Sequence, residues 1–95
     1  MTKKEIISQL YDINCYYAKK GFTKKYSKKW LLDRFNRNML IVAFNKSMNK
    51  VLGFTCGANL VGIPNYINLV LLCVHKDYIR QRVGTKLVNQ FRKHF

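Results

Sequence analysis

Residues 69–88 read LVLLCVHKDYIRQRVGTKLV and form the most informative segment of the chain. An apolar run ends at Val74, a short polar turn follows, and a loop containing Gly84 then opens a helix. The first turn of a helix offers unpaired backbone N–H groups and the positive end of the helix dipole. Glycine lets an anion approach the backbone closely, because it has no Cβ. Strand, glycine loop and helix together predict a site for a phosphate group.

Three strands are predicted up to the end of this apolar run. Residues 66–74 are almost all apolar, which is typical of a strand covered on both faces. Residues 39–44 and 51–61 are β-type runs on either side of the polar turn at 45–50, so they predict a hairpin. The turn-forming residues at 62–65, GIPN, separate this hairpin from the third strand.

Helices are predicted at both ends of the chain. Residues 3–19 have apolar side chains at helical spacing behind a capping box, Thr2 to Glu5, and Gly21 ends this helix. Ser27 predicts the N-cap of a second, shorter helix. A last helix follows Gly84, and its apolar face consists of Val83, Leu87, Val88, Phe91 and Phe95.

These elements predict an α/β (α+β) fold in the order α-α-β-β-β-α, with a mostly antiparallel three-stranded sheet and helices packed on it. The 95 residues, 48% of them apolar, suffice for one domain over residues 1–95. The net charge of +14 favours an anionic partner. Lysines are concentrated in residues 19–29, where there is no acid.

Several classes of protein are excluded by the composition. No apolar run reaches the roughly 18 residues of a membrane span, and we expect no signal peptide. Cys15, Cys56 and Cys73 are odd in number and form no C-x-x-C, so we expect reduced cysteines in a cytoplasmic protein. The two histidines, His75 and His94, have no helical partner, and we expect no metal.

The residue pattern of positions 69–88 resembles the acetyl-CoA-binding core of the GNAT N-acetyltransferase superfamily. Members of that superfamily typically have the pattern L-x-V-H-P-x-Y-R-G-x-G-I-G-x-x-L-L. The hairpin ending in VLGF at residues 51–54 and the two helices before it also match the order of that family. The residues in register with the motif are Leu72, Val74, His75, Tyr78, Val83, Gly84, Thr85, Lys86, Leu87 and Val88.

The resemblance implies a transferase that moves an acetyl group from acetyl-CoA directly to a primary amine. It implies that the strand end holds the pantetheine arm and that backbone N–H groups of the following loop hold the pyrophosphate. The implied cofactor-binding residues are Leu72, Cys73, Val74, Ile79, Arg80, Gln81, Arg82, Val83, Gly84 and Thr85. The family continues past this helix, so the chain resembles a truncated member that lacks the C-terminal part.

The sequence departs from the family pattern at several positions. The family reads R/Q-x-x-G-x-G/A, and here Ile79 stands at the R/Q position while Arg82 replaces the first glycine. The family often has a general-base Glu on the strand before this loop, where this chain has apolar residues and Asn68. The catalytic residue therefore stays unassigned.

Two further readings stay open on the sequence alone. The lysines of residues 19–29 and the aromatic side chains among them fit a nucleic-acid-binding module or the binding of an acidic protein. Alternatively, the chain is a degenerate relative of the family that acts through protein contacts. An exposed sheet edge, where the family has its next strand, also predicts a homodimer or a partner that pairs there.

Overall fold

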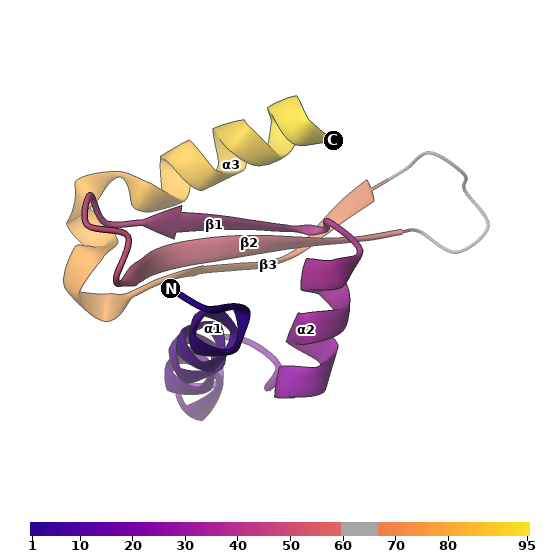
Figure 1. The fold of residues 1–95 in the computed structure, drawn as a ribbon, viewed down its shortest axis with the longest axis horizontal. Coiled ribbons are helices and arrows are strands. Elements are labelled where there is room, and N and C mark those ends of the chain that lie inside the picture. Colours follow the sequence, from indigo (N-terminus) through magenta and orange to yellow (C-terminus); the bar gives the residue numbers. More distant parts are fainter. Residues whose placement is uncertain (60–66) are drawn as a thin grey trace.

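The computed structural model describes residues 1–59 and 67–95, and its elements follow the predicted order (Figure 1). The predicted fold class is therefore confirmed. The expected break at 62–65 lies outside the described residues, as do residues 60–61 and 66 of the expected strands. The elements are α1 (Lys3–Lys19), α2 (Lys28–Asn36), β1 (Leu40–Phe44), β2 (Val51–Asn59), β3 (Ile67–Val74), the 3-10 helix η1 (Lys76–Gln81) and α3 (Val83–His94).

The first two helices begin where their caps predict. The Thr2 hydroxyl accepts a hydrogen bond from the Glu5 N–H, and the Glu5 carboxylate accepts one from the Thr2 N–H, which completes the capping box. The Ser27 hydroxyl accepts from the Trp30 N–H at 3.0 Å. Gly21 follows the end of α1 with a φ of +78°, a conformation that glycine adopts without strain.

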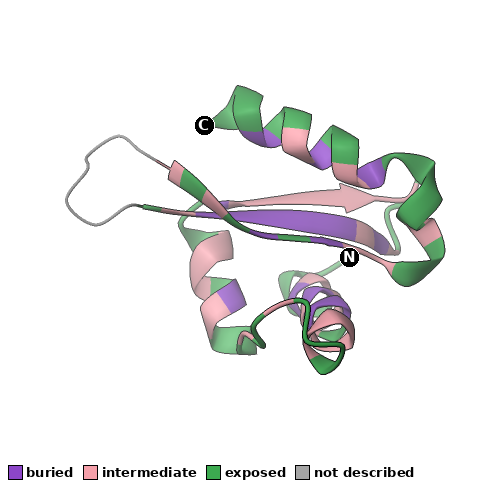
Figure 2. Cartoon of the chain, turned by 180° about the vertical axis from the view of Figure 1, so that it is seen from behind, coloured by how far each residue is buried: buried purple, intermediate pink, exposed green. Residues whose placement is uncertain are grey.

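The sheet has the order β1-β2-β3, and both pairs of strands are antiparallel. The central strand β2 is buried along most of its length (Figure 2). The β2–β3 register shifts between Cys56 and Gly57, so that Cys56 pairs with Leu71 and Gly57 pairs with Leu69. Val70 thus has no partner on β2 and forms a bulge in the edge strand.

Helices cover both faces of the sheet, with α1 and α2 on one face and α3 on the other (Figure 1). The apolar side chains between the sheet and the first two helices form the larger core, which removes their surface from water. This core contains Ile7, Leu10, Ile13, Leu31, Val51, Phe54, Cys56, Leu71 and Cys73. Across the sheet, α3 buries Val83, Leu87 and Phe91, three residues of its predicted apolar face.

The expectation that the third strand is covered on both faces is wrong. β3 lies at the edge of the sheet, and Val70 and Leu72 keep 36% and 38% of their surface exposed. Leu71 and Cys73, which face α1, are buried. Among the residues that the structure describes, no strand pairs with the outer edge of β3, so an apolar run has become an open edge.

Candidate functional site

The segment that joins β3 to α3 is more regular than the sequence predicts. The expected polar turn and loop are in large part the 3-10 helix η1. His75 orders its start, because its Nδ1 accepts a hydrogen bond from the Asp77 N–H at 3.2 Å. The His75 N–H in turn donates to the Leu52 carbonyl at 2.7 Å, which ties the turn to β2. This segment contains no glycine or proline, so the sequence carried no signal for the position of its turn.

Arg82 is the residue that changes the chain direction before α3. It has left-handed backbone dihedrals, with φ 58° and ψ 22°, at the position where the family pattern has glycine. The expectation of a loop at Gly84 is wrong, since Gly84 lies inside the first turn of α3. A Cβ built on Gly84 would meet only the Val74 side chain, at 3.5 Å, which is ordinary contact.

Among the residues that the structure describes, no side chain caps the N-terminus of α3, in contrast to the first two helices. Its first N–H groups therefore face a region where an anion can accept hydrogen bonds. Arg80, Arg82 and Thr85 are exposed around it. The structure thus brings the ten expected cofactor-binding residues into one path, which runs from the end of β3 along η1 into the first turn of α3.

The side chains along this path differ widely in exposure. Ile79 is 57% exposed, although the family has a polar residue there, and Leu72 is also exposed. Val83 and Cys73 are buried. Burial raises the pKa of the Cys73 thiol to about 11, so the thiol stays protonated at neutral pH and is unsuited to act as a nucleophile. The remaining members of the set are half-buried or exposed: Val74, Arg80, Gln81, Arg82, Gly84 and Thr85.

A contact that the sequence did not reveal joins α1 to the end of β3. The Tyr17 hydroxyl donates a hydrogen bond to the Val74 carbonyl. Burial, with a smaller effect from Cys73, raises the pKa of Tyr17, which keeps the hydroxyl protonated as a donor. The helical spacing of Tyr17 predicted a core side chain, and that is how its ring packs. The hydrogen bond had no sequence signal, because its partner is a backbone atom of a distant strand.

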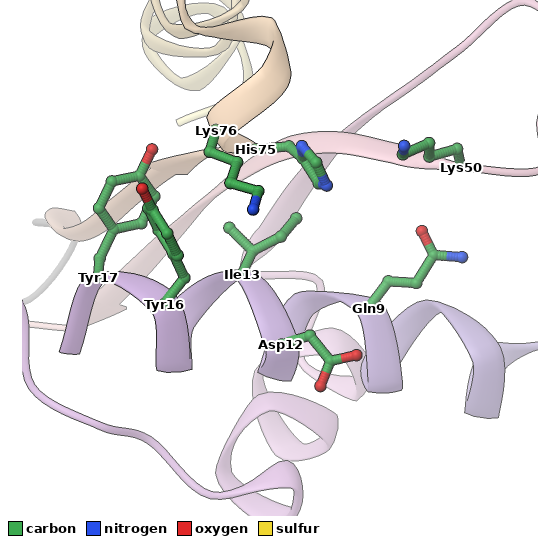
Figure 3. Close-up of a pocket in the computed structure, with 8 residues that line it drawn as sticks. All are labelled: Gln9, Asp12, Ile13, Tyr16, Tyr17, Lys50, His75 and Lys76. Atoms are coloured by element: carbon green, nitrogen blue, oxygen red, sulfur yellow. The ribbon is translucent and has the colours of Figure 1, made fainter. Parts of the chain in front are cut away.

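A cavity of about 370 Å³ lies beside this contact, between α1 and the segment that follows β3 (Figure 3). The Gln9, Ile13 and Tyr16 side chains of α1 point toward the segment that carries His75 and Lys76, whereas the Asp12 carboxylate points away from it. Lys50 extends from the end of the β1–β2 turn. Gln9 also fixes α1 to β2, since its Oε1 accepts from the Val51 N–H at 2.7 Å. The lining residues are Gln9, Asp12, Ile13, Tyr16, Tyr17, Lys50, His75 and Lys76.

The comparison with known protein families agrees with this geometry. The model of the acetyltransferase (GNAT) family matches residues 7–95, which include most of α1, the sheet and the whole segment from β3 into α3. The chain belongs to the GNAT family. Its function is accordingly of the acetyltransferase type, and the resemblance found in the sequence is confirmed. No curated protein and no solved structure matches the chain.

Three further observations concern the part of this GNAT chain that the structure describes. Within residues 1–59 and 67–95, no group of three His, Cys, Asp or Glu side chains is arranged to hold a metal ion. In the same residues no helix is both long and apolar enough to cross a membrane. The three cysteines are free, and Cys56 and Cys73 are buried while Cys15 is half-buried.

Proposed function

We propose that residues 1–95 form one acetyl-CoA-binding domain that transfers the acetyl group of acetyl-CoA to a primary amine. The observation that carries the proposal is the junction from β3 to α3, where an unpaired strand edge leads into an uncapped helix N-terminus. The strand edge offers backbone groups for the amides of the pantetheine arm. The helix N-terminus offers N–H groups for the pyrophosphate, and the exposed guanidinium groups of Arg80 and Arg82 add positive charge.

The chemistry requires little beyond positioning and a basic amine. The lone pair of the neutral amine attacks the acetyl carbonyl, the C–S bond breaks, and the CoA thiolate leaves with a proton from the amine or from water. An N–H of the strand edge would stabilise the developing oxyanion. Asn68 occupies the region where the family often has Glu and cannot accept the proton, so we propose that water or the free-amine form of the acceptor supplies the base.

Calorimetric titration with acetyl-CoA tests the proposal, with ATP as a control for unspecific attraction by the basic surface. We expect micromolar binding of acetyl-CoA and weaker binding of ATP. The variant Gly84→Trp places an indole against the helix N-terminus and should abolish binding, whereas Gly84→Ala should retain it, because the open space beside Gly84 accepts a methyl group. A folded wild-type chain that binds neither acetyl-CoA nor free CoA would refute the proposal.

A second candidate function is the binding of a nucleic acid to the lysine-rich face. The ammonium groups of Lys25 and Lys28 lie 5.8 and 5.3 Å from the Tyr11 ring centroid, so cations and an aromatic ring are presented together. Such binding should weaken steeply with salt. An affinity at physiological salt no higher than that of a scrambled peptide of equal charge would exclude it.

The open edge of β3 also supports a proposal about assembly. A strand of a second copy or of another protein could pair with the part of this edge that precedes Leu72, which leaves the pantetheine-binding end free and would cover Val70. Sedimentation that shows a monomer alone would exclude the homodimer. The free cysteines fit a cytoplasmic protein, and we propose that location.

A further inference from the structure

The cavity between α1 and the β3–η1 junction has an unusual distribution of charge. Lys50 and Lys76 approach it from the sheet side, while the carboxylate of Asp12, on α1, points away from them (Figure 3). The two lysines come from segments far apart in the sequence, so the fold places them together. Among the residues that the structure describes, neither ammonium group has a carboxylate within 4 Å.

Both ammonium groups lie over neighbouring aromatic rings. The Lys50 Nζ lies 5.3 Å from the Tyr78 ring centroid, and the Lys76 Nζ lies 5.6 Å from that of Tyr16. A cation over a ring face keeps its charge, and its other hydrogens remain available to an anion. The lysines are thus oriented before any ligand arrives, which lowers the entropy lost on binding.

His75 adds a third donor between the two lysines. Its Nδ1 accepts from the Asp77 N–H, so in the neutral ring the proton resides on Nε2. The ring also lines the cavity, where Figure 3 shows it between Lys50 and Lys76. Two ammonium groups and an imidazole N–H can together bind a carboxylate or a phosphate monoester by charge-assisted hydrogen bonds.

We propose that this cavity is the acceptor site and that the acceptor is a small amine that also carries an anionic group. The inference rests on the proposed transferase function and specifies its substrate class. The anionic group binds to Lys50, His75 and Lys76. The volume of about 370 Å³ suits a molecule of the size of an amino acid or a short peptide.

Binding of paired probe amines, followed by NMR, tests the inference without knowledge of the natural acceptor. The pairs are β-alanine with β-alaninamide, and O-phosphoethanolamine with ethanolamine. Each pair keeps the amine and changes the anionic group, and the two pairs distinguish a carboxylate from a phosphate. We expect at least one anionic member to shift the signals of Lys50, His75 and Lys76 and to bind about tenfold more tightly than its neutral counterpart.

The double variant Lys50→Gln/Lys76→Gln should lose this preference. Its matched control is Lys46→Gln/Lys93→Gln, which removes the same charge at exposed positions outside the cavity lining and should keep the preference. Equal binding of charged and neutral probes, absence of shifts at the three residues, or equal loss in both double variants would overturn the inference.

Acetyl-CoA titration of the same variants separates this inference from the proposed function. We expect Lys50→Gln/Lys76→Gln to bind acetyl-CoA within about twofold of the wild type. A loss of about tenfold in that variant alone would mean that the cavity holds phosphates of the cofactor, which refutes the acceptor site and leaves the transferase intact. Absence of acetyl-CoA binding in the wild type would refute the transferase, while the NMR result still decides whether the cavity binds anions.

Discussion

The Tyr17 hydroxyl of α1 donates a hydrogen bond to the Val74 carbonyl, 57 residues further along the chain, at the point where β3 ends. This bond joins the first helix to the strand end that leads into the proposed cofactor path. Tyr17 also lines the cavity between α1 and the segment that follows β3. A single side chain therefore connects the proposed acceptor and cofactor sites.

Tyr17→Phe should lower the free energy of unfolding by about 1 kcal/mol, because the Val74 carbonyl loses its donor while the ring packing is kept. For a domain of this size the melting temperature should fall by roughly 4–8 °C. Tyr16→Phe is the matched control, since its hydroxyl makes no hydrogen bond among the described residues. Equal melting temperatures for the two variants would show that the Tyr17 bond contributes nothing to stability.

Arg82→Gly should raise the free energy of unfolding by about 1 kcal/mol. The left-handed backbone costs an L-residue about 1–2 kcal/mol, and the greater freedom of glycine in the unfolded chain offsets part of the gain. Met48→Gly is the matched control, because it makes the same kind of exchange at another left-handed residue. Met48 has a φ of 57° and lies in the β1–β2 turn, away from α3. Chemical denaturation of both variants measures the effect.

The same pair of variants tests whether the Arg82 guanidinium contacts the cofactor. Arg82→Gly should weaken acetyl-CoA binding about threefold through loss of a charge-assisted contact, and Met48→Gly should leave the affinity unchanged. Tighter binding by Arg82→Gly would contradict this and would show that the side chain obstructs the path.

The sequence predicted the elements that local chemistry controls. Thr2 and Ser27 are caps whose effect extends over a single turn, so the starts of α1 and α2 were correct. The prediction of a loop at Gly84 was wrong, because glycine is a strong turn signal while the turn itself falls on Arg82. An arginine gives no local sign of a left-handed conformation, since the fold imposes it.

The cavity and the open edge escaped prediction for a different reason. Lys50 and Lys76 lie in different segments, and a single sequence gives no evidence that they meet. Likewise, an apolar run such as β3 has the same hydrophobic pattern whether the strand lies at the centre of a sheet or at its edge. The number of strands that pair with it is a property of the whole fold.

Asn14→Ala should destabilise the chain by about 2–3 kcal/mol. The fully buried Asn14 amide donates to the Thr23 hydroxyl and the Lys24 carbonyl and accepts from the Tyr26 N–H, so it holds the α1–α2 loop against α1. Asn36→Ala removes an exposed amide with a single contact to Lys3 and should change stability by less than about 0.5 kcal/mol. Urea denaturation compares them, and similar values for both would contradict the assigned role.

Two glycines should respond oppositely to alanine. A Cβ at Gly53 would lie 2.8 Å from the Cys73 carbonyl oxygen, so Gly53→Ala must move backbone and should destabilise by about 2 kcal/mol or more. Gly84→Ala fills free space within a helix and should stabilise by about 0.5–1 kcal/mol. Thermal melts test the contrast, and a loss of stability in Gly84→Ala would mean that the first turn of α3 needs glycine for its own structure.

The buried thiols predict a loss of stability at alkaline pH. Burial raises the pKa of Cys73 to about 11 and that of Cys56 to about 12, from a usual value of 9.0. Above pH 9 the unfolded chain releases these protons while the folded chain keeps them. The stability contributed by each thiol is therefore complete below pH 9 and falls by about 1 kcal/mol per pH unit up to the folded pKa.

Cys73→Ala isolates this effect from the lysines and tyrosines that titrate in the same range. Between pH 7 and pH 10, the free energy of unfolding of the wild type should fall by about 1 kcal/mol more than that of the variant, as measured by urea denaturation. Cys15→Ala is the control, because Cys15 is only half-buried and should follow the wild type. Parallel pH profiles for the wild type and Cys73→Ala would mean that the Cys73 thiol titrates in the folded chain as it does in the unfolded one.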